Sequence, residues 1–85
     1  MYQLNLLESP KKFLKKIKDK KLLLKLVKAI ESLKYNPLPS ASKKLKGDLG
    51  YRVRIGDYRV LYTVDKVIHI VEIYKLVTEK IFIDN

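Results

Sequence analysis

One segment of the chain alternates between apolar and basic residues on both sides of a glycine turn, and this pattern constrains the fold most strongly. Residues 51–55 form the first alternating run, Gly56 and Asp57 form the turn, and residues 58–64 form the second run. Two such runs joined by two turn residues are typical of a β-hairpin. Side chains of a strand alternate between the two faces of a sheet, so the apolar set forms one face, which we assign to the core. The opposite face carries all three arginines of the chain: Arg52, Arg54 and Arg59.

The turn places Arg54 directly opposite Arg59 on the neighbouring strand. Like charges in this position destabilise a sheet, and a bound anion would offset that cost. The planar guanidinium group can bind a phosphate through two parallel hydrogen bonds, whereas the ammonium group of lysine acts as a point charge. We therefore favour a phosphate-binding site over the alternative, a basic strand face that contacts only water.

The charge of the chain indicates a polyanionic or acidic partner. At 85 residues, the sequence is expected to form a single domain (residues 1–85) around one core of two packed layers. Its net charge of +10 attracts nucleic acid, a ribosome or an acidic protein. The many lysines between residues 11 and 28 have a simpler explanation, because they fit the exposed sides of amphipathic helices.

Several classes of site and location are disfavoured by composition. The chain has no cysteine and one histidine, so it cannot form a disulfide or a thiolate site, and we predict no metal and no cofactor. It has no apolar stretch of about 18 residues and no signal-peptide pattern at its start. We therefore predict no membrane span and a cytoplasmic location.

The remaining elements follow from spacing and turn residues. Residues 2–7 alternate and predict a first strand, Ser9 is placed to cap a first helix, and Asp19 is placed to cap a second helix. The second helix ends before Pro37, a loop extends to about Gly50, and residues 67–74 form the last strand of a meander. The order β-α-α-β-β-β predicts an α+β domain with a helical hairpin on one face of an antiparallel sheet. The first strand must pair with a later strand, and we expect the arginine face to remain open to solvent.

The last strand and the segment after it supply further candidates. A tight turn at Asp65 and Lys66 would place Glu72 opposite Arg59, and would place His69 on the core face as a packed histidine. Residues 76–85 are compatible with a short helix, an extension of a strand or a docked arm.

The central segment resembles the signature of the RelE/ParE toxin superfamily. The resemblance rests on a Leu-Lys-Gly loop at residues 45–47, a Tyr-basic-apolar-basic strand at residues 51–54, and a Gly-Asp-Tyr-Arg turn and strand at residues 56–59. It implies a β-α-α-β-β-β domain over nearly the whole chain. Similarity to the RelE branch implies a toxin that cleaves mRNA on the ribosome without a metal ion and thereby inhibits translation. It also implies that a cognate antitoxin holds this toxin inactive. Arg52 and Arg54 match the paired basic positions of that branch, and Arg59 matches its arginine that binds the transition state.

The C-terminal part departs from the family pattern. RelE relatives carry a segment resembling Gly-His/Lys-Arg followed by Val-Tyr. This chain has Leu76 at the arginine position, and Phe82 falls at the tyrosine position if two residues are inserted. Two alternatives therefore stay open: a toxin that inhibits DNA gyrase, as in the ParE branch, and a catalytically impaired module that binds RNA or antitoxin.

Catalysis also needs an acid and a base, because arginine does not release its proton at neutral pH. Lys75 can bind phosphate or be a surface charge, and Glu72 can act as a base or form a cross-strand ion pair. Tyr74 can stack on a base or pack within the protein. For contact with the ribosomal RNA backbone, we select three lysines near the start of the hairpin: Lys43, Lys44 and Lys46.

Overall fold

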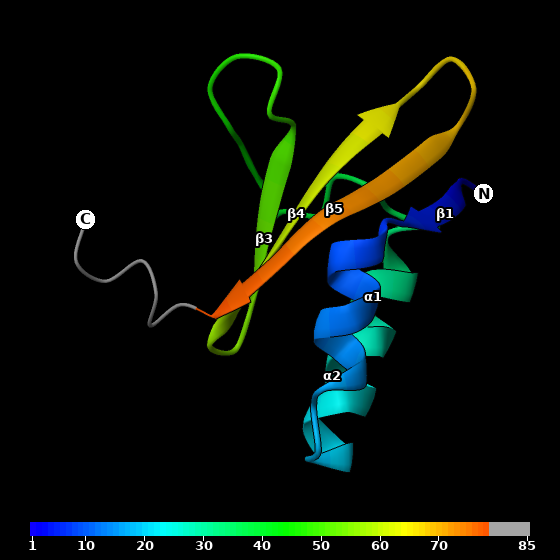
Figure 1. The fold of residues 1–85 in the computed structure, drawn as a ribbon. Coiled ribbons are helices and arrows are strands. Elements are labelled where there is room, and N and C mark those ends of the chain that lie inside the picture. Colours follow the sequence, from blue (N-terminus) through cyan, green and yellow to red (C-terminus); the bar gives the residue numbers. More distant parts are fainter. Residues whose placement is uncertain (79–85) are drawn as a thin grey trace.

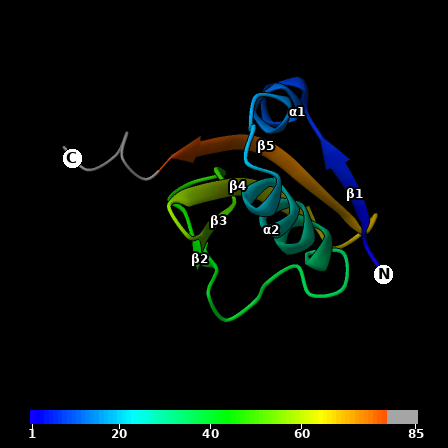
Figure 2. The same cartoon turned by 90° about the horizontal axis from the view of Figure 1, so that it is seen from below.

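The computed structural model of the chain describes residues 1–78 and consists of one sheet layer and one helix layer (Figure 1). Its elements are β1 (Gln3–Leu6), α1 (Glu8–Lys15), α2 (Lys20–Ser32), β2 (Lys43–Lys44), β3 (Tyr51–Ile55), β4 (Tyr58–Asp65) and β5 (Ile70–Thr78). The strands form a five-stranded sheet in the order β1-β5-β4-β3-β2. Both helices pack against the same side of this sheet, because Phe13 of α1 and Leu26 of α2 belong to one core with its strands. Figure 2 views the two helices from their lower ends. The predicted α+β class with a helical hairpin on one face is confirmed.

The first strand pairs with the last described strand. β1 runs parallel to β5, from Gln3 beside Ile70 to Leu6 beside Ile73. Parallel neighbours cannot be joined by a tight turn, and here the whole helical hairpin and the β2–β4 region separate them in sequence. The prediction that the first strand lies against a later strand is therefore confirmed.

The helix starts show one correct and one wrong prediction. The Asp19 carboxylate caps α2, because it accepts hydrogen bonds from the backbone N–H groups of Lys21 at 3.0 Å and Leu22 at 3.3 Å. Helix α1, however, begins at Glu8, with Leu7 in the cap position and no side-chain cap, so Ser9 is not the cap. Pro10 still fits, because the first four N–H groups of a helix have no partner within it.

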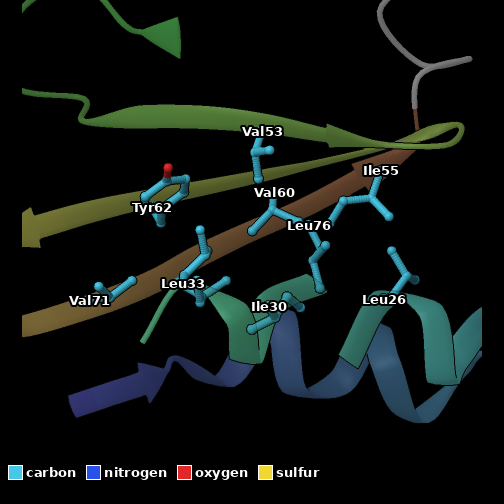
Figure 3. Close-up of a cluster of buried hydrophobic side chains, with 10 residues drawn as sticks. Leu26, Ile30, Leu33, Val53, Ile55, Val60, Tyr62, Val71 and Leu76 are labelled. Carbon is cyan, nitrogen blue, oxygen red and sulfur yellow. The ribbon is translucent and has the colours of Figure 1, made fainter. Parts of the chain in front are cut away.

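The core lies between α2 and the inner face of the sheet (Figure 3). It contains Leu26, Ile30 and Leu33 next to Val53, Ile55, Val60, Tyr62, Val71, Ile73 and Leu76. The apolar face predicted for the β3–β4 hairpin therefore is the core face.

Tyr62 is fully buried in this core and carries a polar group that needs a partner. Its hydroxyl donates a hydrogen bond of 2.8 Å to the carbonyl oxygen of Pro37, which ties the segment after α2 to the sheet. Burial raises the pKa of Tyr62, the hydrogen bond with Ser42 lowers it, and the nearby Tyr51 raises it slightly further. The phenol is therefore neutral and able to donate at neutral pH.

The connection between β4 and β5 differs from the predicted tight turn. Residues 66–69 form a four-residue turn, in which the Asp65 carboxylate accepts from the N–H groups of Val67 at 2.9 Å and Ile68 at 3.1 Å. A bulge also shifts the register between Leu61 and Tyr62. Both effects move β5 along β4. The predicted pairing between Glu72 of β5 and Arg59 of β4 changes as a result.

The corrected register changes the positions of three residues. Arg59 lies opposite Val77, so the prediction that Glu72 lies opposite Arg59 is wrong. His69 lies in the turn, is exposed and has a positive φ of 57°, so its predicted place on the core face is also wrong. The centroid of its ring lies 5.0 Å from the centroid of the Tyr2 ring.

Two further expectations concern the ends of the sheet. The segment expected to be a loop up to Gly50 contains the short strand β2, which extends the predicted meander by one edge strand. Residues 76–78 continue β5, whereas residues 79–85, including Phe82, lie outside the described residues. Within residues 1–78, no helix has the length and apolar composition needed to cross a membrane.

Candidate phosphate-binding site

The sheet face that points away from the helices is here called the outer face. It carries a row of four aligned residues, one from each of four strands, and three of them are basic. Residues paired across neighbouring strands point to the same face. The register aligns Lys43 of β2 with Arg52 of β3, Arg52 with Leu61 of β4, and Leu61 with Lys75 of β5. Neighbouring strands are about 5 Å apart, so the three cations of this row lie within about 15 Å. The strand pairing thus gathers charges that are distant in the sequence.

A second row of the outer face adds the two remaining arginines. Arg54 lies opposite Arg59, as predicted, because Gly56 adopts a positive φ of 60° in the tight turn between the strands. Arg54 is exposed and Arg59 is half-buried. The next residue of this row, Val77, is only 8% exposed, so the outer face is not open everywhere, contrary to our expectation. We call the two rows together the basic site: Lys43, Arg52, Arg54, Arg59 and Lys75.

The three lysines selected for RNA contact occupy different places. Lys43 belongs to the basic site. Lys44 pairs with Tyr51, which packs against the core, so Lys44 lies on the inner side of the edge strand. Lys46 is exposed in the connection between β2 and β3.

Glu72 lies on the outer face at the other side of the first basic row. It pairs with Thr63, and its carboxylate accepts a hydrogen bond of 3.1 Å from the side-chain amide of Asn5. Thr63 is four residues from Arg59 along β4, which corresponds to about 13 Å, but only two residues, or about 7 Å, from Leu61. Glu72 is therefore a neighbour of the row that contains Arg52 and Lys75, and it is remote from Arg59.

A shallow depression of about 220 Å³ lies beside this carboxylate on the outer face. Its lining is formed by Asn5, Thr63, Asp65, Ile68, Ile70 and Glu72. Asn5 was missed as a site neighbour in the sequence. The alternation of Leu4, Asn5 and Leu6 places its side chain on the outer face, but only the register between β1 and β5 places it beside Glu72.

Tyr74 occupies the extra position created by the bulge in β5. The register passes from Ile73, paired with Tyr62, to Lys75, paired with Leu61, and leaves Tyr74 without a directly opposed residue. Its hydroxyl donates a hydrogen bond of 2.7 Å to the carbonyl oxygen of Leu49. Burial raises the pKa of Tyr74 above that of an ordinary tyrosine, which is already protonated at neutral pH, so the hydroxyl is able to donate.

The site chemistry is that of a cationic surface with one neighbouring carboxylate. Among residues 1–78, no three histidine, cysteine, aspartate or glutamate side chains come together in a way that could hold a metal ion. Guanidinium and ammonium groups, by contrast, are suited to bind phosphate oxygens. The described residues therefore fit an anionic ligand.

Comparison with known proteins identifies the family. Residues 5–75 match the family described as the ParE toxin of the type II toxin-antitoxin system parDE. The chain is 48% identical over 63 residues to a protein of Methanocaldococcus jannaschii assigned as toxin RelE1, covering 67% of this chain and 70% of that protein.

Solved structures of toxins share the fold. The archaeal RelE-RelB complex from Pyrococcus horikoshii contains a chain that matches with a TM-score of 0.78 and 28% identity, over 92% of this chain and 94% of that chain. A chain of the E. coli RelBE complex also gives a TM-score of 0.78, at 20% identity, over 92% of this chain and 96% of that chain. With its family match over most of the sequence and its RelE-like fold, the chain belongs to the RelE/ParE superfamily of toxins from type II toxin-antitoxin systems.

Proposed function

We propose that this toxin is a metal-independent endoribonuclease that cleaves mRNA on the ribosome and thereby inhibits translation. One observation carries the proposal. The sheet register aligns Lys43, Arg52 and Lys75 in one row, and it places Arg54 and Arg59 in the adjacent row of the same face. Five cations on one face match a scissile phosphate together with the neighbouring phosphates of an RNA strand.

The reaction would begin with attack of a ribose 2′-hydroxyl on the adjacent phosphorus. This step forms a pentavalent intermediate that carries additional negative charge, and it is followed by departure of the 5′-oxygen. Positively charged groups fixed before the reaction stabilise such charge without having to reorganise. We assign this role to Arg52, Arg54 and Arg59, whose guanidinium groups can each contact two phosphate oxygens.

Proton transfer needs other side chains, because arginine keeps its proton at neutral pH. Glu72 and Lys75 border the first row from the same strand, β5, and they are candidates for the base and the acid. In this arrangement Glu72 accepts the proton of the 2′-hydroxyl and Lys75 supplies charge or a proton at the leaving 5′-oxygen. The hydrogen bond from Asn5 holds one carboxylate oxygen of Glu72 and leaves the second oxygen to act on the substrate.

Cleavage of a defined mRNA in a purified translation system tests the proposal. We expect Arg59→Ala to lower the cleavage rate by about 10²–10³-fold, the usual loss for one group that stabilises the transition state. Lys66→Ala is the matched control, since it removes one positive charge from the exposed turn at the other end of β4. Cleavage by folded Arg59→Ala at the rate of the control would contradict the assignment of the site.

Arg54 allows charge and geometry to be separated. Arg54→Lys keeps the positive charge but loses the bidentate contact, so we expect a loss of activity well beyond that of the Lys66→Ala control. Equal activity of the Arg54→Lys and wild-type proteins would mean that only charge is needed at this position.

Binding to the ribosome should depend strongly on salt. Each contact between a cation and a phosphate releases counterions, so affinity falls as salt concentration rises. The proposed contacts outside the catalytic centre are Lys43, Lys44 and Lys46. Charge-neutral variants at these positions should reduce the steepness with which the logarithm of affinity falls as the logarithm of salt concentration rises. A flat response of the wild-type protein to salt would argue against an RNA-contacting surface.

A second candidate function is inhibition of DNA gyrase, and it is favoured by the match to the ParE toxin family. A supercoiling assay with purified gyrase discriminates between the two functions. Inhibition of supercoiling without mRNA cleavage would support the gyrase function. Absence of both activities, together with retained RNA or antitoxin binding, would identify a catalytically impaired module.

We also propose a cognate antitoxin as the protein partner. The related toxin from Pyrococcus horikoshii was crystallised in complex with RelB. The charge of +10 favours an acidic segment near the basic site, and Leu61 and Ile70 provide apolar surface on the same outer face. Arg54→Glu is therefore expected to weaken both antitoxin binding and mRNA cleavage. Unchanged antitoxin affinity would place the antitoxin at a distance from the basic site.

A further inference from the structure

The connection between β2 and β3 forms a protruding hairpin beside the basic site. The N–H of Leu45 donates a hydrogen bond of 2.8 Å to the carbonyl oxygen of Gly50, which closes the hairpin. We call residues 46–49 the hairpin tip. All four residues of the tip are exposed, and they include Lys46.

Side-chain packing contributes little to the position of this tip. Leu49, its one large apolar residue, is 59% exposed. A Cβ atom added at Gly47 would meet no heavy atom within 4 Å, so open space surrounds that position too. The tip must therefore be held mainly by polar contacts and by the two strands from which it extends.

Tyr74 provides such a polar contact from a distant strand. Its hydroxyl donates a 2.7 Å hydrogen bond to the carbonyl oxygen of Leu49. β5 and β3 are separated by β4, a span of about 10 Å, so this hydrogen bond links the tip to a strand that is not its neighbour in the sheet. The next residue after Tyr74 is Lys75 of the basic site, which links the tip directly to the proposed substrate surface.

We propose that Tyr74 is a positioning residue that holds the hairpin tip over the outer face, so that Lys46 is in place to bind an RNA phosphate next to the basic site. This inference rests on the proposed function. A tip that is already ordered loses less conformational freedom when RNA binds, and this raises affinity without new contacts. Tyr74 thus acts on RNA binding and has no part in bond cleavage.

The effect has a defined size and kinetic signature. One hydrogen bond contributes about 1 kcal/mol, which corresponds to about a fivefold change in affinity. Tyr74→Phe removes only the hydroxyl, so we expect about fivefold weaker RNA binding, a matching rise in KM, and an unchanged kcat. Tyr35→Phe is the matched control, because it makes the same chemical change at a residue that is 74% exposed.

The experiment combines two binding measurements with one structural measurement. Affinity is measured on ribosomes that carry an mRNA with 2′-deoxy nucleotides, which cannot be cleaved by attack of a 2′-hydroxyl. Hydrogen exchange of the Leu45 amide reports whether the hairpin remains closed, and we expect faster exchange in Tyr74→Phe. In a Lys46→Gln background, Tyr74→Phe should have little further effect on affinity, since the contact that it positions is already lost.

Several outcomes would overturn the inference. Unchanged affinity and unchanged Leu45 exchange in Tyr74→Phe would show that the hydrogen bond does not position the tip. A lower kcat at unchanged KM would assign Tyr74 to the chemical step. Additive effects of Tyr74→Phe and Lys46→Gln would show that the Tyr74 hydroxyl acts on RNA binding independently of Lys46. A loss of affinity only in Tyr74→Ala would indicate that the ring itself contacts RNA.

Failure of the proposed function would look different. A wild-type protein that binds the modified mRNA complex but does not cleave normal mRNA would refute the nuclease, and the Tyr74 measurements would still decide the inference. A wild-type protein that cleaves normally, with a Tyr74→Phe variant identical to it, would refute the inference alone.

Discussion

Two glycines in the β2–β3 hairpin allow backbone conformation and steric contact to be tested separately. Gly47 and Gly50 both have positive φ angles, of 65° and 84°. An alanine at either position therefore pays for a left-handed conformation, about 1–2 kcal/mol. At Gly47 nothing lies within 4 Å of the added Cβ, so this cost stands alone. At Gly50 the Cβ would overlap the carbonyl oxygen of Tyr62, a backbone atom that cannot rotate away.

The expected stability losses follow from these two terms. Forced overlap in a packed region typically adds 1–3 kcal/mol, so Gly50→Ala should lose about 2–5 kcal/mol and Gly47→Ala about 1–2 kcal/mol. A domain of this size shifts its Tm by about 4–8 °C per kcal/mol. Urea unfolding monitored by circular dichroism, together with thermal melts, gives both values. Equal losses for the two variants would refute the argument that close approach of β3 and β4 requires glycine at position 50.

The remaining predictions concern the core, a helix cap and pH. Leu26→Ala should lose about 2–5 kcal/mol because the side chain is fully buried, whereas Leu24→Ala, at 55% exposure on the same helix, should change stability by less than about 0.5 kcal/mol in urea unfolding. Asp19→Ala should lose about 1 kcal/mol with its two cap hydrogen bonds, and no change would show that the cap is replaced by water. Since burial raises the pKa of Tyr62, its stabilising contribution is complete below the ordinary tyrosine pKa of about 10 and is lost as the pH rises through the folded-state value. Urea titrations at pH 9–11 should show that the free energy of unfolding declines with pH in the wild-type protein and declines less in Tyr62→Phe. Equal dependence on pH in the two proteins would contradict this role of Tyr62.

The central hairpin could be predicted from the sequence because its signals are local. The alternation of residues 51–55 and 58–64, with Gly56 in the turn, determines both the pairing of Arg54 with Arg59 and the choice of core face. Asp19 is a similar case, since a cap depends on the next three residues of the chain. Ser9 shows the limit of such rules. The residue after it, Pro10, fits several positions of the first helical turn, so a serine followed by a proline does not mark the start of the helix.

The composition of the basic site could be predicted only in part, because its geometry depends on register between distant strands. The turn at residues 66–69 and the bulge beside Leu61 both move β5, and neither has a strong sequence signal. Glu72 is therefore displaced from Arg59, and Lys75 is aligned with Arg52. The edge strand β2 has two lysines and no alternation, so the position of Lys43 beside Arg52 could not be read from residue pattern.

The parallel pairing of β1 and β5 has a consequence for how the toxin is made. Leu4 and Val71 are neighbours in the sheet but are separated by most of the chain, and such long-range contacts slow folding. During synthesis, β1 emerges first and has no strand to join until β5 has been translated. The outer face likewise lacks Glu72 and Lys75 until that moment. The basic site therefore cannot form before β5, the last strand within residues 1–78, has been made.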